Sequence, residues 1–187
     1  MNLGPEMSYA IRSGGNPWSV VTHMFMHGGW FHIIGNMWFL AIFGDNVEDS
    51  MGPVRFLIFY LLCGFAAAFT QMMLAPDSGV PMVGASGAIG GVMGAYVVLF
   101  PRAPVHMLVI LGFFITRIVV PAFLMLGYWF LMQLAGVAFS TGSGGGVAFG
   151  AHVGGFIAGL VLIFPFRSMD RVRRIRLHSG VWKSWRK

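Results

Sequence analysis

The feature that most constrains this chain is a stretch of residues, 118–166, in which Asp, Glu, Lys and Arg are all absent. A second uncharged stretch covers residues 13–44. Soluble domains carry about 25% charged residues, whereas this chain carries 10% and is 57% hydrophobic. A helix needs roughly 20 apolar residues to cross a bilayer. The expected fold class is therefore all-α, a polytopic bundle of transmembrane helices.

Turn-forming and charged residues divide the apolar sequence into five expected spans. The acidic run 44–49 ends the first span, and Pro53 suits the first turn of the second because proline is favoured there. A glycine- and serine-rich stretch, 140–146, is flexible by composition and separates the last two spans. The expected spans are residues 29–43, 53–74, 86–100, 119–139 and 148–166.

The segment 103–116 is too short to cross a bilayer comfortably, and Arg102 and Arg117 flank it. If the segment does not cross, both arginines share one face with the basic C-terminal residues. That arrangement agrees with the rule that positive charge gathers on the cytoplasmic side. We therefore expect an interfacial or re-entrant segment here.

Basic residues gather at the C-terminus, where eight of the twelve Lys and Arg lie at or after Arg167. This distribution is typical of a cytoplasmic tail that touches anionic lipid headgroups, and it disfavours nucleic acid as the partner. Residues 1–166 are thus expected to form the membrane domain, and residues 167–187 a basic cytoplasmic tail. Cys63 is the only cysteine, so the chain forms no internal disulfide.

Three polar residues lie near the non-cytoplasmic ends of their spans in this topology. His32 lies early in the first span, Ser86 begins the third, and His152 lies early in the fifth. Ionisable and polar side chains are expensive to hold within a membrane and are usually functional. The topology therefore predicts that these three side chains converge at one depth.

A serine and a histidine at one depth are typical of a serine hydrolase. A serine hydroxyl becomes an effective nucleophile when a base takes its proton, and histidine is the usual base. Ser86 also begins a helix, where unpaired N–H groups favour negative charge. His32 and Asn36 are four residues apart, so both project from one helix face and are candidate donors to an oxyanion.

Glycines explain how Ser86 and His152 could meet. Small residues four positions apart let membrane helices pack closely. Close packing of the third and fifth spans is expected to bring the imidazole within hydrogen-bond reach of the hydroxyl. The glycine pairs are Gly87/Gly91, Gly90/Gly94 and Gly155/Gly159.

Three motifs follow one another along the chain, and together they resemble the rhomboid family of intramembrane serine proteases. The resemblance covers roughly residues 16–166, and the acidic run 44–49 is similar to that of bacterial members. The motifs are His27-Gly28-Gly29-Trp30-Phe31-His32-Ile33-Ile34-Gly35-Asn36, Gly84-Ala85-Ser86-Gly87, and Ala151-His152-Val153-Gly154-Gly155 followed by Gly159.

The resemblance implies a Ser–His dyad without an acidic third member, in which Ser86 is the nucleophile and His152 the base. It implies that His32, Asn36 and the backbone N–H of Ser86 form the oxyanion hole. It further implies that His27 braces the first loop. Residues expected to support the site structurally are His27, Gly84, Gly87, Gly155 and Gly159.

The resemblance also implies endopeptidase activity on transmembrane protein substrates near the non-cytoplasmic face, without a metal or cofactor. Flexing of the helix at 119–139 and of the loop at 139–149 would admit the substrate. The expected location is the bacterial cytoplasmic membrane, with the C-terminus in the cytoplasm. Family members have six core helices, and this chain begins inside what would be the loop after the first, which leaves five spans.

Other functions fit part of the pattern. A catalytically silent rhomboid-like protein would bind transmembrane helices, but intact Ser86 and His152 disfavour this reading. A channel or transporter would need a polar pathway, and the sequence offers no carboxylate for one. A zinc site at His23, His27 and His32 is disfavoured because neither an HExxH motif nor a neighbouring carboxylate accompanies them.

Overall fold

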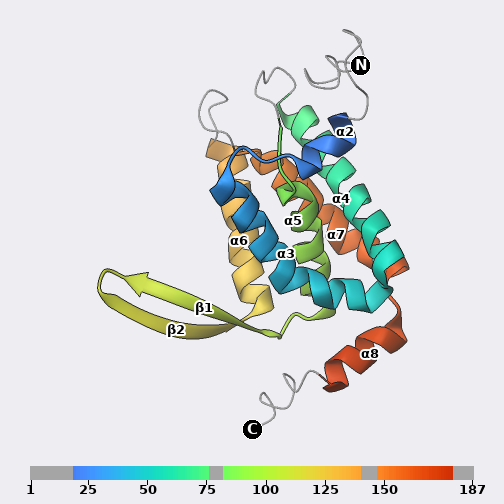
Figure 1. Ribbon diagram of the computed structural model, residues 1–187, viewed down its shortest axis with the longest axis vertical. Helices are drawn as coiled ribbons and strands as arrows, with labels where there is room; N and C mark the ends of the chain where they lie inside the picture. Colours follow the sequence, from blue (N-terminus) through green and yellow to red (C-terminus); the bar gives the residue numbers. More distant parts are fainter. Residues whose placement is uncertain (1–18, 76–81, 140–146, 179–187) are drawn as a thin grey trace.

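The computed structural model describes residues 19–75, 82–139 and 147–178, which form a mostly helical bundle with one β-hairpin (Figure 1). The glycine- and serine-rich stretch 140–146 and the end of the predicted tail lie outside these residues. In chain order the elements are α2 (Ser19–Thr22), the 3-10 helix η1 (His23–Phe25), α3 (Trp30–Met51), α4 (Pro53–Leu74), α5 (Ser86–Leu99), β1 (Pro104–Leu111), β2 (Phe114–Pro121), α6 (Ala122–Phe139), α7 (Phe149–Phe166) and α8 (Met169–His178).

A helix occupies each of the five expected spans, so the predicted helical bundle is confirmed. Within the described residues, α4, α6 and α7 are long and apolar enough to cross a membrane. The apolar helix α5 is shorter, with 14 residues, and is buried along most of its length. The predicted bounds of α4 match the structure, and those of α5 and α7 differ by one residue.

Helix α3 is longer than predicted, because it continues through the acidic run 44–49 to Met51. The helical period lets the acidic side chains avoid the core: Val47 is fully buried, while Asp45 and Asp49 are exposed. The helix ends at Gly52, whose φ of 92° favours glycine. Pro53 then begins α4 at once, so the two helices are joined by a tight turn.

Residues 104–121 depart from the otherwise helical fold and form a β-hairpin, which includes most of the predicted interfacial or re-entrant segment 103–116. Strands β1 and β2 pair antiparallel from Pro104 opposite Pro121 to Leu111 opposite Phe114. The turn contains Gly112, whose φ of 60° favours glycine. Pairing between the strands satisfies the backbone groups that β1 and β2 turn toward each other.

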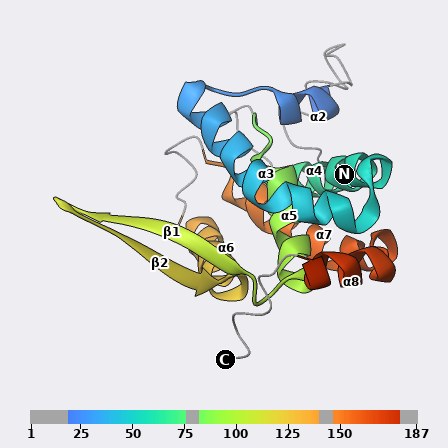
Figure 2. The ribbon, with the colours of Figure 1, turned by 60° about the horizontal axis from the view of Figure 1, so that its bottom comes forward.

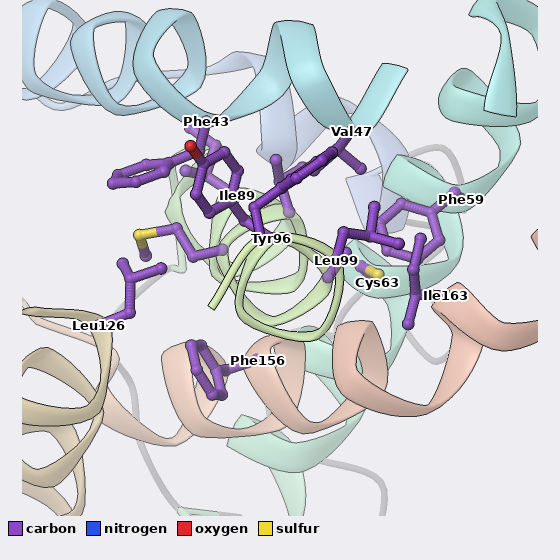
Figure 3. Close-up of a cluster of buried hydrophobic side chains, with 14 of the residues drawn as sticks. Phe43, Val47, Phe59, Cys63, Ile89, Tyr96, Leu99, Leu126, Phe156 and Ile163 are labelled. Carbon is purple, nitrogen blue, oxygen red and sulfur yellow. The ribbon is translucent and has the colours of Figure 1, made fainter. Parts of the chain in front are cut away.

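Helix α5 lies at the centre of the bundle, and α3, α4, α6 and α7 surround it (Figure 2). Apolar side chains from all of these helices meet around α5 (Figure 3). The first residue of this central helix therefore lies where several neighbours can reach it. The labelled core side chains are Phe43, Val47, Phe59, Cys63, Ile89, Tyr96, Leu99, Leu126, Phe156 and Ile163.

Helices α5 and α7 pack through glycine on both sides. A methyl group added to Gly155 would overlap the carbonyl oxygen of Gly87, and one added to Gly159 would overlap that of Gly91. One i, i+4 glycine pair therefore faces another in register, as the spacing predicted. Gly94 is similarly close to the Phe156 carbonyl oxygen. The separation of the two helices is thus set by backbone atoms.

Candidate active site

Ser86 is the first residue of α5 and is half-buried. Its Oγ lies 2.8 Å from Nε2 of His152, which belongs to the first turn of α7. The predicted approach of these two side chains is therefore present in the structure. The glycine contacts between α5 and α7 begin one residue after Ser86, so they fix the distance between the two helix ends that carry the pair.

The first turn of α7 is held by a side chain from α4. Gln71 Oε1 accepts a hydrogen bond of 3.1 Å from the backbone N–H of Ala151. An N–H in the first turn has no partner within its own helix, so this contact satisfies a group that would otherwise be unpaired. It also anchors the residue that immediately precedes His152. Gln71 was missed in the sequence analysis.

His152 also contacts α6 through its second ring nitrogen. Its Nδ1 lies 2.8 Å from Oε1 of Gln133, which is only 8% exposed. The Trp129 ring lies 5.7 Å from the imidazole, centroid to centroid. Gln133 was likewise missed in the sequence analysis. The available signal was an amide within an uncharged apolar stretch, where polar side chains are expensive to hold.

His32 faces the loop that precedes Ser86. A methyl group built on Gly84 would lie 2.7 Å from His32 Nε2, so this position leaves room only for glycine. Gly84 also has a φ of 123°, a second reason why glycine suits it. The N–H of Gly28 donates to His32 Nδ1 over 3.4 Å. In the neutral ring the proton is therefore on Nε2, the nitrogen that faces the site.

Asn36 lies one helical turn after His32, on the same side of α3. It is 7% exposed, and its Nδ2 is buried without a hydrogen-bond partner. The same Nδ2 would lie 3.8 Å from a methyl group on Gly84. Buried donors in folded proteins are nearly always paired, so an unpaired one at this place requires an explanation.

His27 packs against His32 edge to face, with 5.3 Å between ring centroids. Burial lowers the pKa of His27, and the neighbouring His32 ring lowers it further, while a hydrogen bond involving the Phe25 backbone opposes both effects. Burial and the neighbouring His32 ring therefore both favour the neutral form of His27.

The residues around the loop before α5 are also fixed. The N–H of Gly84 donates to the carbonyl oxygen of His23 over 2.9 Å, which ties the loop to η1. Met24, in the middle of η1, is buried against Gly64 of α4. Within the described ranges, no three His, Cys, Asp or Glu side chains are grouped so as to hold a metal ion.

The arrangement places a hydroxyl within hydrogen-bond distance of an imidazole nitrogen, and His32 and Asn36 lie beside Gly84 in the loop that precedes this hydroxyl. The fold and this site together define a class: polytopic helical membrane proteins with a hydrogen-bonded serine–histidine pair. The Rhomboid domain model matches residues 14–169. The chain therefore belongs to the rhomboid family, and it is a multi-pass membrane protein.

Several characterised proteins are similar in sequence. Rhomboid-like protein 11, chloroplastic, from Arabidopsis thaliana is 32% identical over 81% of this chain and 55% of its own length. Rhomboid protease GluP from Bacillus subtilis is 33% identical over 81% of this chain and 27% of its own length. RHOMBOID-like protein 6, mitochondrial, from Arabidopsis is 35% identical over 46% of this chain. The chain spans about a quarter to about half of the length of these relatives.

Proposed function

We propose that this protein is an intramembrane serine endopeptidase that cleaves transmembrane protein substrates. The observation that carries the proposal is the 2.8 Å contact between Ser86 Oγ and His152 Nε2. The buried, unpaired Nδ2 of Asn36 near Gly84, two residues before Ser86, adds support, because it is a donor without an acceptor. Membership of a family that includes a protease at 33% identity agrees with this function.

In the proposed mechanism, His152 Nε2 takes the Ser86 proton while Oγ attacks the scissile carbonyl carbon. The tetrahedral oxyanion accepts hydrogen bonds from His32 Nε2, Asn36 Nδ2 and the Ser86 backbone N–H. The protonated His152 then gives its proton to the leaving amine, the C–N bond breaks, and an acyl-enzyme remains. His152 next deprotonates a water molecule, which hydrolyses the ester and restores the serine hydroxyl.

The proposed substrates are transmembrane helices that unwind near the non-cytoplasmic face, with small residues at the cleavage point. A stable helix engages its carbonyl groups in hydrogen bonds, so local unwinding is needed to expose one to Ser86. Residues 167–187, with their arginines and lysines, would then lie in the cytoplasm against anionic lipid. The reaction needs no metal or cofactor.

A serine-directed fluorophosphonate probe and a transmembrane peptide substrate test the function. We expect the wild-type protein in lipid vesicles to react with the probe and to cleave the peptide, and the Ser86→Ala variant to do neither. Ser50→Ala is the matched control, because Ser50 is fully buried and donates to the Val47 carbonyl oxygen, away from His152.

Two outcomes would contradict the proposal. Labelling that persists in Ser86→Ala would mean that another residue reacts with the probe. A wild-type protein that binds the peptide but neither cleaves it nor reacts with the probe would instead be a silent helix-binding member of the family.

A further inference from the structure

The imidazole of His152 is held on both of its nitrogens, and one of the two partners comes from α6. Gln133 Oε1 lies 2.8 Å from His152 Nδ1. At its other end, Gln133 Nε2 donates to the Trp129 carbonyl oxygen over 3.1 Å. Because the amide nitrogen is engaged by a carbonyl, the amide oxygen is the atom that faces the ring.

This orientation determines where the proton of the neutral imidazole lies. An amide oxygen accepts hydrogen bonds and has none to donate, so His152 Nδ1 must carry the hydrogen. The lone pair is then on Nε2, the atom 2.8 Å from Ser86 Oγ. This is the tautomer that can take the serine proton, and the opposite tautomer cannot.

The same face of α6 also orients the plane of the ring. Trp129 and Gln133 are one helical turn apart, and the Trp129 ring lies against the imidazole at 5.7 Å with an interplanar angle of 40°. A buried amide in an apolar helix is costly unless it is hydrogen-bonded. Gln133 is bonded at both ends, so the cost is offset only while α6 stays docked beside α7.

We propose that Gln133 is a positioning residue whose amide oxygen holds His152 in the tautomer that activates Ser86. The proposal rests on the proposed function, and it adds a neutral third member to the serine–histidine pair. It also makes the docking of α6 a condition for an active base, because Gln133 moves with this helix.

Two substitutions at one position test this role. Gln133→Met removes both the N–H that donates to the Trp129 carbonyl oxygen and the oxygen that accepts from His152. An ionised glutamate in Gln133→Glu also lacks the N–H, but it keeps an oxygen that accepts from His152. We expect Met to lower kcat by about 10- to 100-fold with little change in KM, as is common when a group that orients a catalytic side chain is lost. We expect Glu to restore most of kcat.

Nitrogen-15 NMR of the His152 ring supplies a measurement that does not depend on turnover. The wild type and Gln133→Glu should show the hydrogen on Nδ1, and Gln133→Met should show a mixture of tautomers. An unchanged kcat and tautomer in Gln133→Met would overturn the proposal. Equal losses of kcat in Met and Glu, with equal losses of thermal stability, would also overturn it, because they indicate a packing role. A wild type that cleaves no substrate would contradict the proposed function instead.

The β-hairpin carries an independent inference. It leaves the bundle at the end where α5 ends and α6 begins, the same end as α8, and extends sideways from the helices (Figures 1 and 2). Strand residues alternate between two faces. On the inner face, Val105, Met107 and Val120 pack against the core. The outer face is exposed and consists of His106, Leu108, Ile115, Arg117 and Val119.

The geometry points to the lipid surface of the membrane as the partner of this outer face. The face combines aliphatic side chains with Arg117, and Phe113 at the turn is fully exposed. The helix α8 at the same end carries a cluster of exposed arginines. Apolar side chains beside arginine suit the boundary between acyl chains and anionic headgroups. The apolar side chains contact the acyl chains, and the arginine is attracted to the headgroups.

A spin label on the hairpin turn tests the contact. In a Cys63→Ala background, Phe113→Cys is labelled and placed in vesicles with or without anionic lipid. We expect the label to be reached by oxygen, which concentrates in the acyl region, more than by a water-soluble nickel chelate. A label at Asp49→Cys, exposed in the acidic run of α3, is the aqueous control. Arg117→Gln should increase the access of the nickel chelate to the label at position 113, and only in vesicles that contain anionic lipid.

Equal access of the nickel chelate to both labels would overturn the lipid contact. Protection from oxygen and nickel together, increasing with protein concentration, would also overturn it, because a second copy of the chain would then cover the face.

Discussion

Asn36 combines a buried side chain with a hydrogen-bond donor that has no acceptor. A buried donor left without an acceptor costs about 1–3 kcal/mol, yet Asn36 Nδ2 has no partner although the residue is 7% exposed. His32, on the same helix face, holds its Nε2 proton toward the same loop because Gly28 occupies Nδ1. Both observations are explained if the acceptor is an oxygen that becomes negative only during the reaction.

The Asn36→Leu variant tests this explanation. Leucine keeps a similar volume but removes the donor, so kcat should fall by about 100-fold while KM changes little. Asn46→Leu, on the same helix but beyond the site, is the matched control and should leave kcat unchanged. Steady-state cleavage of a transmembrane peptide measures both constants. A rise in KM at constant kcat would mean that Asn36 binds the substrate and does not stabilise the transition state.

The sequence predicted which residues form the site better than it predicted their hydrogen-bond partners. Ser86, His32, Asn36 and His152 stand out because polar side chains are unusual within apolar spans. Gln133 has the same property, but its partner depends on the rotation of α6 about its axis. Uncharged spans do not define that rotation, because lipid and protein faces are equally apolar. The roles of the predicted site residues stay predictions until they are measured.

At the scale of elements, the pairing of α5 with α7 depends on an absence of side chains. Gly155 packs on Gly87, and Gly159 packs on Gly91. The carbonyl oxygen of the α5 glycine lies where a Cβ on the α7 glycine would be in each pair. The four-residue spacing predicted this contact because it needs only the helical period. The hairpin was missed because a short apolar run fits a strand as well as an interfacial or re-entrant segment, and only the pairing of the two strands across Gly112 identifies the strands.

Two alanine variants should distinguish the loss of the close contact between α5 and α7 from the general effect of replacing a glycine within a helix. Gly155→Ala would place a methyl on the Gly87 carbonyl oxygen, so α7 must shift, with a cost of about 1–3 kcal/mol in the stability of the bundle. Activity should be largely lost, because the shift separates His152 from Ser86. Gly127→Ala, on α6 with nothing nearby, should change stability by less than about 1 kcal/mol. Thermal unfolding and peptide cleavage provide the measurements, and full activity in Gly155→Ala would contradict the expectation.

At the scale of the whole molecule, α8 connects the turn between α3 and α4 with the far end of α5. The N–H of Ser168 donates to the Ser50 carbonyl oxygen over 2.8 Å, and Arg176 donates to the Leu99 carbonyl oxygen. Val172 is 1% exposed and joins the main core. The basic segment was predicted as a tail because its many charges outweigh the few apolar residues, Val172 and Ile175, that pack against the core, yet part of it is a packed helix.

Substituting Val172 should therefore weaken the bundle without altering the chemistry. Val172→Ala should lower the free energy of unfolding by about 1–2 kcal/mol, because a buried side chain loses two methyl groups. Val161→Ala, on α7 and 63% exposed, should have a much smaller effect in detergent. Unfolding curves monitored by circular dichroism compare the two. A large fall in kcat for the folded Val172→Ala protein would show that α8 influences the site directly.

The contact of glycine with backbone between α5 and α7 has a consequence for how the protein meets different bilayers. Long side chains at an interface can slide or change rotamer when helices tilt, but main-chain atoms in contact cannot rearrange in this way. Changes in bilayer thickness should therefore be absorbed by the outer helices, while the spacing of hydroxyl and imidazole stays constant. For the proposed protease, lipid composition would then govern how often a substrate enters and would have little effect on the rate of peptide-bond cleavage.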